Sequence, residues 1–281
     1  MGKPFVIAQI SDLHCGSRYH IPSLANRVID ELNSLEPDVV LVTGDLTDMG
    51  FAPEMRAARR LLDHVDCEQL LVLLGNHDAR NVGDELFEAL FGTRNKELLL
   101  TGVHILGLDS SEPDLDSGHV GRSNHAWIEQ RFADPDEFKI VAMHHHLVPV
   151  PGTGRERNVV RDAGDLLQVL SANGTDLVLC GHKHVPNVWR LEDMLIVNAG
   201  TACTHRLRGT VKPSYNILEI HGHDRVRVLL KEPHKDPEIV ADLRAHARAC
   251  KWRAGEPAEC GQDGRPIHDL GDDGTAQAAS D

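Results

Sequence analysis

Short runs of apolar residues recur along the chain, and glycine or polar residues end each of them. Most of these runs are four to six residues long and rich in Val, Ile and Leu, which is typical of buried strands. The pattern predicts strands at Phe5–Ile10, Val39–Thr43, Leu70–Leu74, Val103–Leu108, Lys139–Met143, Leu177–Cys180, Leu195–Val197, Tyr215–Ile220 and Val226–Leu230.

Amphipathic patterns with helical spacing lie between the early strands. The clearest covers Ile21–Leu35, with Pro22 in its first turn and Pro37 beyond its end. Weaker patterns predict further helices at Pro53–Val65, Asp84–Phe91, Ser123–Phe132, Asp162–Ser171 and Glu238–Arg248. The alternation predicts an α/β fold with largely parallel strands early in the chain, and the short turns after Cys180 favour antiparallel pairing. We expect two packed mixed sheets flanked by helices, in one domain over residues 1–250.

The composition changes from about Trp252 onward, where Gly, Asp, Ala and Pro dominate and apolar residues are scarce. Such a segment cannot bury a core, so residues 251–281 are predicted to be a solvated, disordered tail. Cys250, Cys260 and His268 fall in or beside this segment, but their spacing matches no zinc pattern.

Charge and cysteine content restrict the class of protein. The chain has 281 residues, 29 Lys and Arg against 43 Asp and Glu, and a net charge of −14. This excess argues against a nucleic-acid partner or a basic membrane-surface protein, but a bound metal can still attract an anionic substrate. Six cysteines without a C-x-x-C pair, no signal peptide and no apolar run of about 18 residues predict a cytoplasmic protein with reduced thiols and no membrane segment.

Five polar motifs follow directly on five of the predicted strands. In open α/β sheets the carboxyl ends of the strands form one crevice, so these loops can converge. Carboxylates and an amide beside imidazoles suit two divalent metals about 3.5–4 Å apart, and imidazole with carboxylate favours transition metals over Mg or Ca. The motifs are Ser11-Asp12-Leu13-His14, Gly44-Asp45-Leu46-Thr47-Asp48, Gly75-Asn76-His77-Asp78, His144-His145-His146 and Gly181-His182-Lys183-His184.

In this order the motifs resemble the calcineurin-like metallophosphoesterase superfamily, and most of all its class III cyclic-nucleotide phosphodiesterase group. The resemblance spans residues 5 to about 220 and implies a four-layer α/β/β/α sandwich. It also implies two divalent transition-metal ions, from among Mn, Fe, Zn, Co and Ni. By matching motif positions, one ion is held by Asp12, His14 and His184, the other by Asn76, His144 and His182, and Asp45 bridges them.

The same resemblance implies a phosphodiesterase in which a metal-bound hydroxide attacks phosphorus in line. His77 would protonate the leaving group or stabilise its charge, and Asp78 would orient His77. The expected substrates are small-molecule phosphodiesters, cyclic nucleotides first. The alternatives are a phosphomonoesterase or nuclease that uses the same site, and a non-catalytic regulator that binds metal.

Three departures from the family pattern refine this interpretation. Met49 and Gly50 follow Asp48, so the phosphate-gripping Arg of the protein phosphatases is missing, and purple acid phosphatases have a Tyr ligand where this chain has Asp48. Asp48 is instead expected to cap a helix or bond a loop. The family's His-His-Pro is His-His-His-Leu here, which leaves the roles of His145 and His146 open. The Arg155–Arg161 loop, and also Arg206 and Arg208, remain candidates for binding the substrate or for ordinary solvated loops. The oligomeric state is also open, a homo-oligomer included.

Overall fold

The computed structural model describes residues 3–100, 102–154, 158–222 and 225–244. These residues belong to one compact unit that ends at Ala245. The tail over 251–281 lies outside the described residues, so its disorder and the domain boundary at 250 stay predictions. Among the described residues, no helix is both long and apolar enough to cross a membrane.

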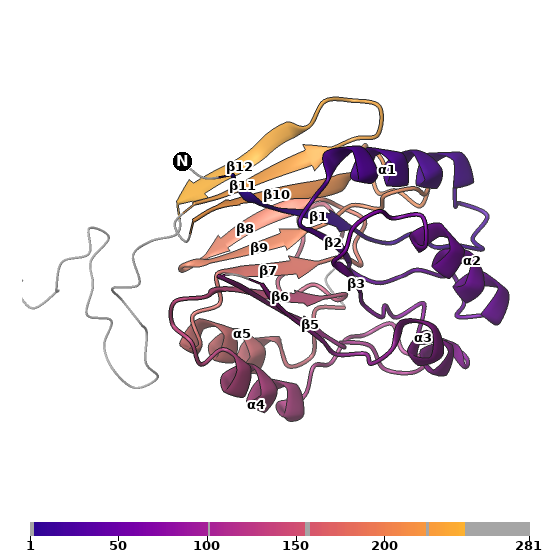
Figure 1. Cartoon of the computed structure of the whole chain (residues 1–281). Helices are drawn as coiled ribbons and strands as arrows, with labels where there is room; N and C mark the ends of the chain where they lie inside the picture. Colours follow the sequence, from indigo (N-terminus) through magenta and orange to yellow (C-terminus); the bar gives the residue numbers. More distant parts are fainter. Residues whose placement is uncertain (1–2, 101, 155–157, 223–224, 245–281) are drawn as a thin grey trace, which may run out of the picture. The chain divides into compact units, whose positions relative to one another are not determined.

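In the described part of the chain, twelve strands form two mixed sheets of six strands each (Figure 1). The first sheet has the spatial order β12 (Glu238–Arg244), β11 (Arg225–Lys231), β10 (Tyr215–His221), β1 (Phe5–Ile10), β2 (Val39–Val42) and β3 (Leu70–Val72). The second has the order β4 (Lys96–Leu100), β5 (Val103–Leu108), β6 (Phe138–Met143), β7 (Leu177–Cys180), β9 (Met194–Asn198) and β8 (Asn187–Leu191). β1, β2 and β3 run parallel to one another, as do β5, β6, β7 and β9.

Within the residues that the structure describes, five helices cover the outer faces of the two sheets. One apolar cluster joins the first sheet to α1 (Pro22–Leu35), α2 (Ala52–Leu62) and α3 (Gly83–Phe91). A second cluster joins the other sheet to α4 (Arg122–Arg131) and α5 (Ala163–Ala172). A third cluster, with residues from both sheets, fills the space between them. The predicted four-layer α/β/β/α sandwich is confirmed.

Each strand predicted from the apolar runs forms, and so do the five predicted helices up to Ser171. The short strands β4 and β8 were not predicted. Both lie at sheet edges, where partly exposed side chains give a weak apolar signal. Antiparallel pairing after Cys180 is correct for the β8–β9 pair and for β10 to β12, but β9 joins β7 in parallel.

The predicted helix over Glu238–Arg248 is wrong, because Glu238–Arg244 is strand β12. Residues 245–248 lie outside the described part of the chain. Over seven residues, helical and alternating apolar patterns are hard to tell apart. Pairing with β11 decides the outcome, because it places Ala241 and Leu243 against the core between the sheets.

Candidate metal centre

The five motifs meet at the carboxyl ends of their strands. Three of them follow β1, β2 and β3 of the first sheet, and the other two follow β6 and β7 of the second. The tertiary structure thus brings the seven predicted ligands into two adjoining groups, Asp12, His14, Asp45 and His184 in the first and Asp45, Asn76, His144 and His182 in the second.

The first group is compact and buried. His184 Nε2 lies 3.1 Å from Asp12 Oδ1 and 3.1 Å from His14 Nε2. Asp45 Oδ2 lies 3.7 Å from His14 Nε2. Four nitrogen and oxygen atoms therefore surround one small volume, which has the size and donor set of a metal site.

The second group begins at the other oxygen of the same carboxylate. Asp45 Oδ1 lies 3.3 Å from His144 Nε2. Asn76 Oδ1 lies 3.0 Å from His144 Nε2 and 3.0 Å from His182 Nδ1. The two oxygens of Asp45 thus face two different groups, which is the arrangement of a bridging carboxylate.

The hydrogen bonds on the far side of the imidazoles show that these atoms meet lone pair to lone pair whenever the imidazoles are neutral. A backbone carbonyl can only accept, so His144 Nδ1 donates to the Thr43 oxygen at 2.7 Å and His184 Nδ1 donates to the Arg206 oxygen at 2.5 Å. A neutral imidazole has one N–H, so Nε2 of His144 and of His184 presents a lone pair to the acceptors around it. Lone pairs at such distances repel one another unless positive charge lies between them, so the residues present fit metal ions.

Electrostatics supports the same conclusion. Burial lowers the pKa of His14 to about 3, so this imidazole is neutral, as a metal ligand must be. Burial also opposes protonation of His144, but the Asp45 carboxylate outweighs it and raises the pKa of His144 to about 9. The buried carboxylates therefore create a negative field that binds positive charge, either protons or metal ions.

Backbone strain is concentrated at this site. Five of the seven predicted ligands are non-glycine residues with positive φ, an arrangement that costs on the order of 1–3 kcal/mol each. The φ angles lie between 45° and 73°, at Asp12, His14, Asp45, His182 and His184. The left-handed conformation turns each side chain off the end of its strand and into the shared volume, which explains why the strain is kept.

Close backbone approach explains one of the motif glycines. A Cβ on Gly75 would lie 2.1 Å from the Asp45 nitrogen and 2.3 Å from Asp45 Oδ1. Any side chain there would push the loop after β3 away from the loop after β2, and Asn76 would move away from Asp45 with it.

His77 lies beside the first group, with its ring centroid 4.7 Å from that of His14 in an edge-on arrangement. Its Nδ1 donates to the carbonyl of Asp48 at 2.6 Å, which leaves Nε2 to face the guanidinium of Arg206 at 3.1 Å. The ring is therefore oriented by a backbone carbonyl.

The expectation that Asp78 orients His77 is wrong, since among the described residues no hydrogen bond joins them. The Asp78 carboxylate instead accepts from the backbone nitrogens of Leu46, Thr47 and Gly75, and from Thr47 Oγ1. The distances are 2.7–3.0 Å and the carboxylate is fully buried. Asp78 ties the loop after β2 to the loop after β3.

Asp48 also lies elsewhere than at the helix cap that the sequence suggested. Its carboxylate does not cap α2, which has no side-chain cap, and lies among imidazoles instead. Asp48 Oδ1 is 4.0 Å from His14 Nδ1 and 3.8 Å from His77 Nδ1.

Asp116 was not singled out from the sequence. Asn76 Nδ2 donates to Asp116 Oδ1 at 3.2 Å, and Arg80 Nη2 donates to the same oxygen at 2.8 Å. Because an amide has one oxygen and one NH₂, this contact turns Asn76 Oδ1 toward His144. Asp116 lies in the loop after β5, so the rule that polar residues gather at strand ends could have found it.

The remaining candidates lie around this centre or outside the described part of the chain. His145 is buried and bonds Ser110 Oγ through Nδ1 at 2.9 Å, while His146 stacks on His182 with ring centroids 5.4 Å apart. Arg161 pairs with Glu112. Arg155 and Arg157 are outside the described residues, so their role in gripping substrate stays a prediction.

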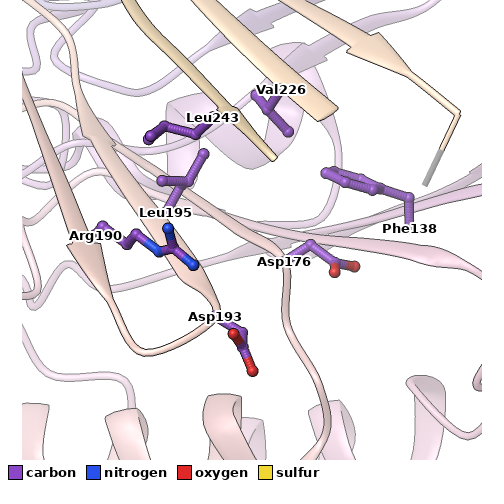
Figure 2. A pocket seen from close by; sticks show the side chains of 7 residues that line it. All are labelled: Phe138, Asp176, Arg190, Asp193, Leu195, Val226 and Leu243. Atoms are coloured by element: carbon purple, nitrogen blue, oxygen red, sulfur yellow. The ribbon is translucent and has the colours of Figure 1, made fainter. Parts of the chain in front are cut away.

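A small cavity between the sheets lies at the opposite, amino-terminal end of β6 and β7 and contains none of the predicted site residues (Figure 2). Its lining is formed by Phe138, Asp176, Arg190, Asp193, Leu195, Val226 and Leu243. The five motifs and this cavity therefore lie at opposite ends of the strands.

Comparison with known proteins agrees with the geometry. The family model described as calcineurin-like phosphoesterase matches residues 5–186. A probable cyclic nucleotide phosphodiesterase of Rhodococcus erythropolis is 26% identical over 216 residues, which are 72% of this chain and 71% of that protein. A cAMP/cGMP dual specificity phosphodiesterase of Mycobacterium tuberculosis is 29% identical over 199 residues, 64% of this chain and 62% of that protein. The chain thus spans less than two thirds of the mycobacterial relative.

A probable glycerophosphodiester phosphodiesterase of Arcobacter nitrofigilis is 27% identical over 221 residues, 70% of this chain and 78% of that protein. Among solved structures, a purple acid phosphatase from yellow lupin has a TM-score of 0.66 at 11% identity, covering 87% of this chain and 54% of that one. A dimetal phosphatase from Danio rerio has a TM-score of 0.63 at 13% identity, covering 87% of this chain and 99% of that one. At such identities the two structures support the fold alone.

Proposed function

Because the chain belongs to the calcineurin-like phosphoesterase family, we propose that it hydrolyses small-molecule phosphodiesters with the help of two metal ions. The observation that carries the proposal is the position of Asp45, whose two oxygens face two groups of lone-pair donors. In this proposal Asp45 is shared, Asp12, His14 and His184 hold one ion, and Asn76, His144 and His182 hold the other.

Two divalent ions bound there would supply a water-derived nucleophile at neutral pH and positive charge for the phosphoryl oxygens. Manganese, iron, zinc, cobalt and nickel all suit this set of ligands. The protein's own contribution is to hold the ligands in place: carbonyls bind the outer nitrogens of His144 and His184, Asp116 orients Asn76, and Asp78 joins two of the loops.

His77 is the group that we assign to the leaving oxygen. In hydrolysis, the oxygen of water bonds to phosphorus, the bond from phosphorus to the leaving alcohol breaks, and the leaving oxygen takes a proton. As an imidazolium, with its Nδ1–H bound to the Asp48 carbonyl, His77 carries a second proton on Nε2 that it can donate to the leaving oxygen, and the ring is held at the edge of the first group.

The substrate is assigned by similarity to the relatives. Two relatives named as cyclic nucleotide phosphodiesterases favour cyclic nucleotides, and the relative named as a glycerophosphodiester phosphodiesterase favours glycerophosphodiesters as the second candidate. The expected compartment is the cytoplasm, in agreement with the free thiols of Cys15, Cys67, Cys180 and Cys203.

The test is a comparison of two esters of one leaving group. Protein stripped of metal and reloaded with Mn²⁺ is given bis(p-nitrophenyl) phosphate and p-nitrophenyl phosphate side by side. We expect faster cleavage of the diester, abolished by a chelator, and then turnover of a cyclic nucleotide or a glycerophosphodiester. Faster cleavage of the monoester would replace the diesterase with a phosphomonoesterase.

A control variant separates catalysis from simple metal binding. Asn76→Ala should lose turnover while its circular dichroism spectrum stays that of the parent protein. Metal binding without turnover of either ester by the parent protein would favour a non-catalytic regulator.

A further inference from the structure

A guanidinium lies at the open side of the candidate metal centre and has no role in the function proposed so far. Arg206, in the loop between β9 and β10, places Nη1 at 3.1 Å from His77 Nε2 and 3.6 Å from Asp48 Oδ1. The Arg206 side chain is 41% exposed, while that of His77 is 8% exposed. A molecule that approaches His77 from solvent therefore meets Arg206.

The backbone of Arg206 is anchored to the metal centre. Its carbonyl accepts from His184 Nδ1 at 2.5 Å, and its nitrogen donates to Thr204 Oγ1 at 3.1 Å. Thr204 Oγ1 lies 2.9 Å from Thr201 Oγ1, which in turn donates to the Asp12 carbonyl at 2.7 Å. The start of this side chain is thus fixed relative to the ligands, while its exposed guanidinium can turn toward a bound anion.

The position of Arg206 matters because the second motif supplies no positive charge of its own. The motif Gly44-Asp45-Leu46-Thr47-Asp48 is followed by Met49 and Gly50, so it contains no cationic side chain of its own. In the folded chain the guanidinium of Arg206 comes to Asp48 from a loop more than 150 residues further along the sequence. A cation from another part of the chain therefore lies beside the same motif.

Resting on the proposed phosphodiesterase function, we propose that Arg206 binds the non-bridging oxygens of the substrate phosphoryl group and contributes to specificity. Its Nη1 and His77 Nε2 lie close enough for one phosphoryl oxygen to reach both. A planar guanidinium also matches phosphate geometry with two parallel N–H donors. Arg80, a second arginine beside His77, is already paired with Asp116 at 2.8 Å and is 23% exposed.

The test compares Arg206→Gln with Arg56→Gln, an exposed arginine on α2, as the control. Gln keeps the backbone carbonyl that binds His184 and removes only the cation. For Arg206→Gln we expect roughly a 10- to 100-fold loss of kcat/KM on bis(p-nitrophenyl) phosphate. Inorganic phosphate, titrated by calorimetry into the Mn²⁺-loaded protein, should lose affinity by a similar factor, while metal content and Tm stay unchanged.

Chemical rescue distinguishes an anion contact from a structural role. Guanidinium ion at millimolar concentration should restore part of the activity of Arg206→Ala and none of the activity of Asn76→Ala. Unchanged phosphate affinity in Arg206→Gln would overturn the proposal, and so would a loss of bound metal that accounts for its defect.

The two proposals fail in different ways. A parent protein that binds phosphate but cleaves no ester would refute the phosphodiesterase, and the phosphate titrations of Arg206→Gln would still decide the role of Arg206. A parent protein that turns over the diester, with an Arg206→Gln variant that is as active and binds phosphate as tightly as Arg56→Gln, would refute the role of Arg206 alone.

Discussion

Charged or polar side chains are buried at both ends of the central parallel strands, but the hydrogen-bond partners of these side chains differ between the two ends. At the amino end, Lys139 Nζ donates to the carbonyls of Phe132 and Asn173 at 2.6 and 3.0 Å. His104, also buried, has Glu137 at 2.8 Å on one nitrogen and Glu97 at 3.1 Å on the other. Lys139 and His104 thus both meet acceptors.

At the carboxyl end the acceptors outnumber the donors. Asp12, Asp45 and Asn76 present oxygens to Nε2 of His144 and His184, which carries no proton when the rings are neutral and donate from Nδ1. The comparison shows that burial of a polar residue does not by itself mark a functional site. A buried excess of lone pairs over hydrogen-bond donors does mark such a site, because only an added cation can satisfy those lone pairs.

The largest effect should come from the residue common to both groups. Asp45→Asn should lower metal content and reduce diester turnover by more than the roughly 10–100-fold typical of losing a group outside the metal ligands. Metal analysis together with steady-state kinetics measures both. Asp63→Asn, at an exposed position, is the control, and full metal content in Asp45→Asn would contradict the bridging role.

His77→Gln sharpens the comparison by separating chemistry from metal binding. The variant should lose about 10²-fold or more in kcat with its metal retained. The loss should be greater for diesters with an alkyl alcohol as leaving group than for p-nitrophenyl esters, because a poor leaving group depends more on protonation. Equal losses for both classes would contradict a proton donor at this position.

Asp116→Ala tests a group that acts through a ligand. Without its acceptor, the Asn76 amide is free to turn, and we expect about a tenfold loss of metal affinity or activity. Titration of Mn²⁺ into the stripped protein measures the effect, and Asp114→Ala, in the same loop, is the control. An unchanged affinity would show that the neighbouring imidazoles alone orient Asn76.

At the amino end of the strands, removal of a buried polar group should lower the stability of the protein and leave its activity unchanged. Lys139→Met leaves two buried carbonyls without this donor and should lower the free energy of unfolding by about 1–3 kcal/mol, with activity per folded molecule unchanged. Denaturant unfolding measures the loss against exposed Lys212→Met. A loss of activity without a loss of stability would break the contrast between the two ends.

The smallest effect concerns a fully paired carboxylate on α1. Burial would raise the pKa of Glu31, but the His234 amide, Lys231 and Arg27 outweigh it and lower the pKa from 4.5 to about 2. A depressed pKa contributes stability above pH 4.5 that is lost as the pH falls toward 2. Glu31→Gln should therefore be less stable than the parent at neutral pH.

The gap between Glu31→Gln and the parent should close between pH 4.5 and 2 in denaturant unfolding. Exposed Glu129→Gln should show no such gap. A constant difference down to pH 2 would mean that the charge of Glu31 is not what stabilises this contact.

The periodicity of apolar residues was enough to predict the central strands, the helices that cover them and the layered architecture. It failed at β12 and at the edge strands β4 and β8, where pairing with a neighbour decides the conformation of a short segment. The strand-end rule likewise collected Asp12, Asn76 and His184 at one edge, because parallel strands end together.

What the sequence by itself determined is thus the set of residues: which chemical groups follow which strands, and in which order. Only the tertiary structure decided their partners. Asp78 binds backbone amides in place of His77, Asp116 orients Asn76, and Arg206 reaches His77 from a distant loop. The physical reason is that strand order follows from local periodicity, whereas a hydrogen bond depends on where two loops, set by different strands, bring a donor within about 3 Å of an acceptor.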